Sequence, residues 1–264
     1  MSSKKCRIIL LIAFLLYATT PLYGAQPPAT RHNLCTPPYP SDSLLEWSCV
    51  RLKPGDTLEK LFGDSWQDVA RFNRIDRVHS MPGTRIKVPK TLSDIKGFTP
   101  LPHTYAEKAS LSKFILLDLT EQFLGAYEYG KLVFSAPVTT GEGTNKTPAG
   151  EFFITAHSRN HKSSKYKIHN TDIPYPMNYG LRFLVTKSGV SYWIHGRDVP
   201  GRPASHGCVG LYDEAMQKKY YGVPKDPVLE DAKSLYEWAT GQTADGVFSL
   251  HTDGPQVLII GEAP

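Results

Sequence analysis

Long apolar runs are scarce in this sequence of 264 residues, because no stretch after residue 25 is long and apolar enough to cross a bilayer. Dense runs of lysine and arginine with interleaved aromatic residues are also absent, which argues against a nucleic-acid-binding protein. There is no internal repeat and no glycine-rich loop that would cradle a phosphate. The remaining composition, 41% hydrophobic and 21% charged, is that of an ordinary globular protein and excludes a disordered chain.

The first 25 residues are typical of a secretory signal peptide. Three basic residues precede an apolar run at 8–17, and the small residues Gly24 and Ala25 follow it. An uncleaved membrane anchor is the alternative, although the run is short for a bilayer span. We therefore expect an exported protein of the periplasm or cell envelope, and we leave residues 1–25 out of the fold.

Cysteine is rare, with four residues in the whole chain, and Cys6 lies within the leader. Cys35 and Cys49 are close in sequence and far from Cys208. In an oxidising compartment we predict a disulfide between Cys35 and Cys49. Cys208 is then an odd free thiol, which is either a reactive residue or a buried structural one.

Two segments have the composition of linkers. Residues 26–47 are rich in proline, serine and threonine and indicate an extended arm, which Cys35 would tie to the next unit. Residues 91–110 contain two prolines and indicate a second linker. These segments separate a compact unit at 48–90 from a larger one that begins at residue 111.

The unit at 48–90 has the pattern of a small α+β domain with the order strand, helix, helix, strand. Either Asp56 or Thr57 can cap the first helix, and apolar residues follow one face of the second. The expected elements are 48–52, 58–62, 65–72 and 84–88.

This unit resembles a lysin-motif (LysM) domain along its whole length. Residues 50–58 match the opening of that motif, Asn73 its central asparagine and residues 82–89 its closing strand. The resemblance implies binding to the N-acetylglucosamine-containing glycan strands of peptidoglycan. A copy that only packs against the neighbouring domain is the alternative.

From residue 111 onward, many short strands follow one another with few helices. This pattern predicts a mainly β domain, either a mixed sandwich or a barrel-like fold. The expected strands are 113–119, 124–129, 132–139, 151–156, 182–186, 191–194 and 256–260, and the expected helices are 213–221 and 227–240.

Two histidines and a cysteine, His195, His206 and Cys208, fall within 14 residues of a turn-rich stretch. A cysteine attacks carbonyls as its thiolate, and a nearby imidazole can take the proton and form an ion pair. Gly207 has no side chain, so backbone N–H groups beside the cysteine can point at a developing oxyanion. The cluster therefore predicts a cysteine nucleophile.

The alternative chemistry for this cluster is a zinc site with His195, His206 and Cys208 as three ligands. His206 and Cys208 are only two positions apart, which is tight for two ligands, and no fourth ligand has a suitable spacing. We therefore expect neither a metal nor an organic cofactor.

Residues 111–262 resemble the L,D-transpeptidase catalytic domain. The matching segments are 138–141, 147–152, 194–196, 205–209 and 254–260. The resemblance implies that Cys208 is the nucleophile, that His195 is its base, and that His206 supports the active-site loop and oxyanion region. Within the matching blocks, Gly196, Ser205 and Gly207 occupy the positions that shape the site.

The resemblance also implies a reaction. The thiolate attacks the carbonyl after the third residue of a tetrapeptide stem of peptidoglycan, D-alanine leaves, and a thioester forms. An amine of another stem or a lysine of an envelope lipoprotein resolves the thioester, or water releases a tripeptide. A lipoprotein-releasing amidase with the same cysteine and a glycan-binding protein with a degenerate catalytic domain are the alternatives. Carbapenems are expected to acylate Cys208.

One position departs from the family pattern. The family commonly has an arginine two positions after the cysteine, where this chain has Gly210. The segment between His195 and Ser205 is also shorter than usual, and it contains Arg197 and Arg202. We hypothesise that one of these arginines supplies the missing positive charge for a substrate carboxylate. Solvated loop arginines are the alternative.

Overall fold

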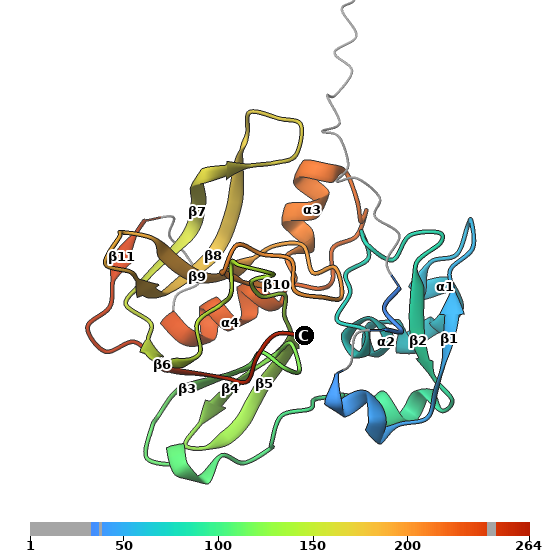
Figure 1. Cartoon of the computed structure of the whole chain (residues 1–264), viewed down its shortest axis with the longest axis horizontal. Coiled ribbons are helices and arrows are strands. Elements are labelled where there is room, and N and C mark those ends of the chain that lie inside the picture. Colours follow the sequence, from blue (N-terminus) through green and yellow to red (C-terminus); the bar gives the residue numbers. More distant parts are fainter. Residues whose placement is uncertain (1–32, 37–38, 242–246) are drawn as a thin grey trace, which may run out of the picture.

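The computed structural model describes residues 33–36, 39–241 and 247–264 (Figure 1). The predicted signal peptide and the first part of the predicted arm lie outside the described residues. Within the described ranges, no helix has the length and hydropathy needed to span a membrane.

The N-terminal unit contains four elements in the predicted order, β1 (Trp47–Arg51), α1 (Leu58–Phe62), α2 (Trp66–Phe72) and β2 (Arg85–Pro89). Strands β1 and β2 pair antiparallel over their whole length. Thr57 is the N-cap of α1, since its side chain accepts a hydrogen bond from a backbone N–H of the first turn. The apolar faces of both helices pack under this two-stranded sheet in one buried cluster.

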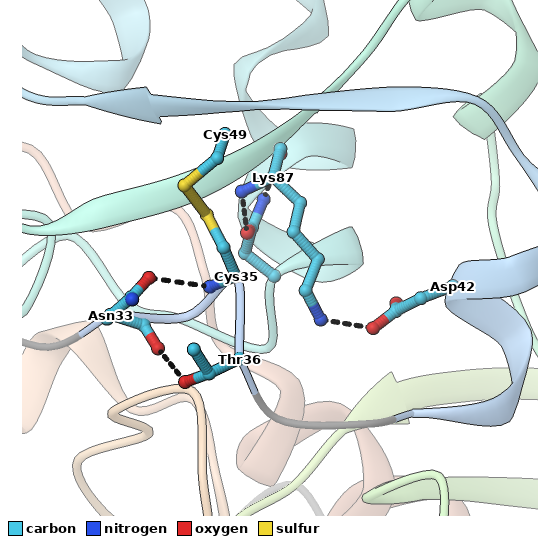
Figure 2. Close-up of a disulfide and its surroundings, with 7 residues drawn as sticks. Asn33, Cys35, Thr36, Asp42, Cys49 and Lys87 are labelled. Atoms are coloured by element: carbon cyan, nitrogen blue, oxygen red, sulfur yellow. Dashed lines mark hydrogen bonds and ion pairs between the residues drawn. A yellow bond between two sulfur atoms is a disulfide. The ribbon is translucent and has the colours of Figure 1, made fainter.

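Residues 33–36 lie beside the two-stranded sheet of β1 and β2. The Leu34 N–H donates to the Arg85 carbonyl at 2.8 Å, and a disulfide joins Cys35 to Cys49, the pair proposed from the sequence (Figure 2). Among the cysteines that the structure describes, Cys208 is free.

Parts of both segments expected to be linkers are folded into the protein. The 3₁₀ helix η1 (Pro40–Leu44) buries Ser41 and Asp42, and Asp42 forms an ion pair with Lys87 (Figure 2). Two further 3₁₀ helices follow β2, η3 (Leu92–Ile95) and η4 (Ala106–Lys108). Proline and serine set local turns there, but buried side chains fix both segments against their neighbours.

The larger unit contains two five-stranded sheets. The first has the order β5-β4-β3-β12-β6, in which β12 runs parallel to β3 and antiparallel to β6. Its strands are β3 (Phe114–Asp118), β4 (Phe123–Glu128), β5 (Lys131–Pro137), β6 (Gly150–Phe153) and β12 (Gln256–Ile260).

The second sheet has the order β10-β9-β8-β7-β11. Its strands are β7 (Ala156–Lys167), β8 (Pro174–Val185), β9 (Ser191–Gly196), β10 (Val209–Leu211) and β11 (Ser249–Leu250). The antiparallel β7–β8 hairpin extends well beyond the rest of the sheet (Figure 1). Most of this hairpin was not predicted, because β7 is polar along most of its length and two prolines, Pro174 and Pro176, lie in the outer part of β8.

Two helices complete the larger unit, α3 (Glu214–Tyr221) and α4 (Asp231–Thr240). Apolar residues of α4 join residues from both sheets in the main hydrophobic core. Few helices and two sheets around one core confirm the mainly β prediction for this part of the chain.

The N-terminal unit shares a hydrophobic cluster with the larger unit. Leu52 and Ile75 from the first unit pack with Val199, Tyr212 and Leu229 from the second, and all five are at most 1% exposed. The Tyr212 hydroxyl also donates to the Ile75 carbonyl at 2.9 Å. The two units therefore bury apolar surface against each other.

Candidate active site

The parallel pairing of β9 and β10 brings the cysteine and the first histidine of the motif to neighbouring strands. Val209 is paired with Ile194 and Gly210 with His195. Cys208 directly precedes Val209, so the same register places it level with residue 193, two positions from His195. The register therefore brings the backbone at Cys208 to the part of β9 that carries His195.

His195 has a buried, neutral imidazole. Its side chain is buried, and Nδ1 lies 2.8 Å from the carbonyl oxygen of Gly196. A carbonyl only accepts hydrogen bonds, so Nδ1 carries the proton and Nε2 keeps its lone pair. Burial and the positive charge of Arg197 lower the pKa of His195 to about 3. The imidazole is thus uncharged at neutral pH and able to accept a proton.

Cys208 is mostly buried, and burial raises the pKa of its thiol. A backbone hydrogen bond from Trp193 and the charge of Arg197 act in the opposite direction and favour the thiolate. Together with the low pKa of His195, these shifts favour a neutral thiol–imidazole pair in the resting site. Burial disfavours the charged form of each group, and therefore the thiolate–imidazolium ion pair that a cysteine and a nearby imidazole can form.

Ser205 shapes the loop before Cys208, the predicted nucleophile. Its hydroxyl donates to the carbonyl oxygen of Cys208 at 2.5 Å and accepts from the Gly207 N–H at 3.0 Å. The Gly207 N–H is therefore bonded within the loop in this structure. The glycine itself is needed, since its φ is +110° and a Cβ would lie 2.4 Å from Cε1 of Tyr192.

Two other segments of the family pattern brace this loop. The Thr147 hydroxyl donates to the Gly207 carbonyl at 2.9 Å and accepts from the Gly141 N–H at 2.9 Å. The Ser205 N–H donates to the Thr140 carbonyl at 2.9 Å. The conformation of the nucleophile loop thus depends on residues about 60 positions earlier in the chain.

His206 is exposed, and its ring stacks on that of Tyr166 with centroids 4.2 Å apart and planes 20° apart. Tyr166 belongs to β7, so this contact joins the nucleophile loop to the long hairpin. Within the residues that the structure describes, no group of three or more His, Cys, Asp or Glu side chains is arranged to hold a metal. The zinc site with His195, His206 and Cys208 is therefore not formed.

Arg197 occupies the space beside Gly210. A Cβ at Gly210 would lie 2.0 Å from Cγ of Arg197 and 2.2 Å from its Cδ. The Arg197 Nη2 donates to the Ala204 carbonyl at 3.2 Å, while its buried Nε has no hydrogen-bond partner among the described residues. The guanidinium lowers the pKa of both Cys208 and His195. Its positive charge is therefore part of the electrostatics of the pair.

Arg202 lies elsewhere. It forms an ion pair with Glu142 at 2.8 Å, and its side chain is 39% exposed. It lines a surface cavity of about 420 Å³ together with Glu142 and Lys146, and neither Cys208 nor His195 belongs to that lining. Of the two arginines considered from the sequence, Arg197 is the one beside the nucleophile.

Aromatic residues that the sequence analysis did not include surround the site. His161 of β7 stacks on Trp193 with centroids 4.2 Å apart, and Tyr175 of β8 lies 5.7 Å from the Arg197 guanidinium. Both come from the long hairpin, which has no recognisable motif. Thr147, in contrast, lies in a segment that matches the family pattern and could have been included on that ground.

The comparisons with known proteins concern mainly the larger unit. The sequence model of the YkuD family, described as L,D-transpeptidase catalytic domain, matches residues 112–259, more than half of the chain. No curated protein sequence matches. A crystal structure of an L,D-transpeptidase from Stackebrandtia nassauensis is similar, with 23% identity over 77% of this chain and 69% of that chain and a TM-score of 0.41. A second, from Xylanimonas cellulosilytica, has 21% identity over 73% of this chain and 77% of that chain, with a TM-score of 0.43. A third, from Mycobacterium tuberculosis H37Rv, shares 15% identity over 57% of this chain and 58% of that chain, with a TM-score of 0.36.

Proposed function

Because the chain belongs to the YkuD family of L,D-transpeptidase catalytic domains, we propose that it is a peptidoglycan L,D-transpeptidase in which Cys208 is the nucleophile and His195 is the base. The observation that supports this proposal is the hydrogen bond between His195 Nδ1 and the Gly196 carbonyl, which leaves Nε2 as a proton acceptor on the strand that pairs with the segment directly after Cys208.

The first half-reaction uses this pair as follows. His195 Nε2 takes the thiol proton as the Cys208 sulfur bonds to the carbonyl carbon after the third residue of a tetrapeptide stem. The imidazolium then gives the proton to the nitrogen of the terminal D-alanine, the C–N bond breaks, and a thioester remains on Cys208. The low pKa of His195 favours this proton return, because the buried imidazolium is a strong acid.

In the second half-reaction an amine attacks the thioester. His195 takes a proton from the attacking nitrogen, the C–S bond breaks, and the proton returns to the Cys208 sulfur. An amine from a second stem gives a 3-3 cross-link, and a lysine of an envelope lipoprotein gives lipoprotein attachment. Water as acceptor would make the protein an L,D-carboxypeptidase.

We further propose that Arg197 binds an anionic group of the acyl donor, such as a carboxylate of the stem peptide. Its buried Nε has no partner among the described residues, and its stem lies across Gly210, next to the strand position of His195. A guanidinium with an unused donor is suited to a carboxylate, which accepts two parallel hydrogen bonds.

The remaining parts of the proposal concern location and wall binding. An exported protein with residues 1–25 as its signal peptide would meet this substrate in the periplasm, and the N-terminal unit would bind glycan strands as a lysin motif. Binding to the wall would raise the local concentration of stem peptides near Cys208. Neither step needs a metal or an organic cofactor.

Mass spectrometry of purified disaccharide-tetrapeptide after incubation with the mature protein tests the proposal. The matched control is Cys208→Ala, which removes the sulfur and little volume. Cross-linked dimer formed only by the cysteine form is the expected result. Tripeptide without dimer would make the protein an L,D-carboxypeptidase. No product from either form would favour an amidase that acts on another bond or a non-catalytic glycan-binding protein.

A further inference from the structure

The loop at 197–204 joins the base to the nucleophile, because it connects the end of β9 to Ser205. Its two ends are held by the larger unit: the Arg197 N–H donates to the Leu211 carbonyl at 2.9 Å, and the Ala204 N–H donates to the Thr140 carbonyl at 3.0 Å. The Arg197 guanidinium bridges the two ends through the Ala204 carbonyl. The residues between these ends include Val199 and Gly201, which are held by other contacts.

The middle of the loop is bound by the N-terminal unit through Asp76. The Asp76 N–H donates to the Val199 carbonyl at 2.8 Å, and its Oδ2 accepts from the Val199 N–H at 2.7 Å. The adjacent residues Ile75 and Pro200 form an antiparallel bridge. One residue of the N-terminal unit thus binds both backbone groups of Val199.

Asp76 binds Val199 as a buried carboxylate anion. Burial alone would raise the pKa of its carboxyl group, but the charge and hydrogen bonds of His79 and the Val199 N–H outweigh burial and keep the pKa below its usual range. Its Oδ2 also accepts from Nε2 of Gln217 at 2.8 Å, and the same Nε2 lies 3.0 Å from Oδ1 of Asp198. The carboxylate therefore fixes both the backbone and a side chain of the loop.

A second contact comes from the segment that precedes the N-terminal unit. The Tyr39 hydroxyl donates to the Gly201 carbonyl at 2.9 Å in a buried environment. Leu34 packs so closely on Gly201 that a Cβ there would lie 2.7 Å from its methyl groups. The loop is consequently held at Val199 and Gly201 by two separate segments that both precede the catalytic domain in sequence.

We propose that Asp76 and Tyr39 are positioning residues of the active site, and that the N-terminal unit fixes the loop that carries Arg197 and leads to Cys208. The proposal rests on the proposed function for its assay and goes beyond it, because it gives this unit a role in turnover that is independent of glycan binding. Turnover of a short soluble stem peptide should therefore depend on Asp76 as strongly as turnover of intact cell wall does.

Three variants of the full-length mature protein test this role. Asp76→Asn removes the negative charge that accepts the hydrogen bond from the Val199 N–H. Tyr39→Phe removes the hydrogen bond to the Gly201 carbonyl and keeps the aromatic ring. Arg71→Met is the matched control, because Arg71 forms a buried ion pair with Asp231 at 2.6 Å across the same interface without contacting the loop. Turnover of soluble disaccharide-tetrapeptide is measured at a temperature at which thermal unfolding shows every variant to be folded.

We expect kcat to fall roughly tenfold to a hundredfold for Asp76→Asn, since small misplacement of reacting groups has effects of that order. A smaller fall is expected for Tyr39→Phe, and kcat of Arg71→Met should stay within about twofold of the parent, as expected for a substitution that costs stability without moving the reacting groups. If Asp76→Asn does not fold, Tyr39→Phe alone decides between a positioning role and a purely structural one. Equal kcat for the loop variants and Arg71→Met would overturn the inference and leave these contacts a purely structural role.

Alkylation of Cys208 by iodoacetamide provides a readout that needs no peptidoglycan substrate. A changed alkylation rate in Asp76→Asn and Tyr39→Phe, with an unchanged rate in Arg71→Met, is expected if the loop sets the surroundings of the thiol. The same rate in all three would contradict the inference. Absence of turnover in the parent protein would refute the proposed function, whereas the alkylation comparison would still decide on the role of the loop contacts.

Discussion

Substitution of Gly210 by alanine tests how Arg197 is held beside the nucleophile. The new Cβ would lie 2.0 Å from Arg197 Cγ and 2.2 Å from Cδ, far inside the contact distance of two carbon atoms. Thr139 Cγ2 lies 2.9 Å from the same point and limits movement of the backbone in the other direction. The stem of Arg197 therefore has to leave its place, and the guanidinium moves with it.

The expected cost has two parts. Overpacking in a dense region costs about 1–3 kcal/mol, and loss of the charged hydrogen bond from Arg197 to Ala204 costs about 1.5–3 kcal/mol. Partial relaxation reduces the sum, so we expect Gly210→Ala to lower the free energy of unfolding by roughly 2–4 kcal/mol. We also expect kcat/KM to fall at least tenfold, about 1.4 kcal/mol in transition-state stabilisation.

The assay pairs turnover of disaccharide-tetrapeptide with denaturant unfolding. Gly189→Ala is the control for a simple loss of stability, because Gly189 lies in the β8–β9 turn with a φ of +82° and nothing within 4 Å of the point where a Cβ would lie. That variant should lose about 1–2 kcal/mol from backbone strain and keep its kcat/KM.

A double variant sharpens the test. Arg197→Gly combined with Gly210→Arg moves the guanidinium to the other side of the same gap, and it should recover activity that Gly210→Arg alone loses. The reasoning is refuted if Gly210→Ala keeps the parent activity, or if the double variant is no more active than Gly210→Arg.

Three further predictions follow from the pKa shifts and hydrogen bonds of the site. His195→Gln removes the proton acceptor and should lower kcat by about 10²–10⁴-fold in the mass-spectrometric assay; a loss below tenfold would contradict its role as base. Alkylation of Cys208 should speed up with pH and level off only above the range of an ordinary thiol, because burial raises the thiol pKa; a plateau below pH 7 would speak against this. His79 has its pKa raised to about 9, with Asp76 as the partner that outweighs burial. Below pH 6.5 this pair should contribute roughly 3 kcal/mol to the free energy of unfolding. This contribution should disappear as the pH rises through 9. The difference in unfolding free energy between the parent and His79→Gln should therefore shrink from pH 6 to pH 10, and a constant difference would refute the assignment.

Local patterns were enough to predict most of the regular elements. Strand β12 coincides with the apolar run at 256–260, and α3 begins directly after its capping residue Asp213, whose carboxylate accepts from Met216 N–H at 2.9 Å. These elements have the period of the structure that they form and clear start and stop signals. Strand β7 has neither, and the prolines at 174 and 176 obscure the outer part of β8, so most of this hairpin was missed.

Cys208 and His195, the pair proposed to react, could be chosen from the sequence because they lie in two short blocks of one motif. The residues that hold them could not, since they come from distant segments: Asp76 is 123 positions from Val199, and Thr147 is 60 positions from Gly207. The protonation state was also beyond the sequence, because it follows from the burial of Cys208 and His195 rather than from their spacing. Arg197 could be chosen over Arg202 only after the packing against Gly210 was known.

Intact-protein mass spectrometry during turnover is the most direct test of the central claim that Cys208 carries the acyl group. The mature protein is mixed with disaccharide-tetrapeptide, quenched in acid within seconds and digested to locate any adduct. The account predicts an added mass equal to the disaccharide-tripeptide acyl group, on the peptide that contains Cys208 and labile to hydroxylamine, with no adduct on Cys208→Ala. Turnover without an adduct on this peptide, or an adduct that persists in Cys208→Ala, would contradict it.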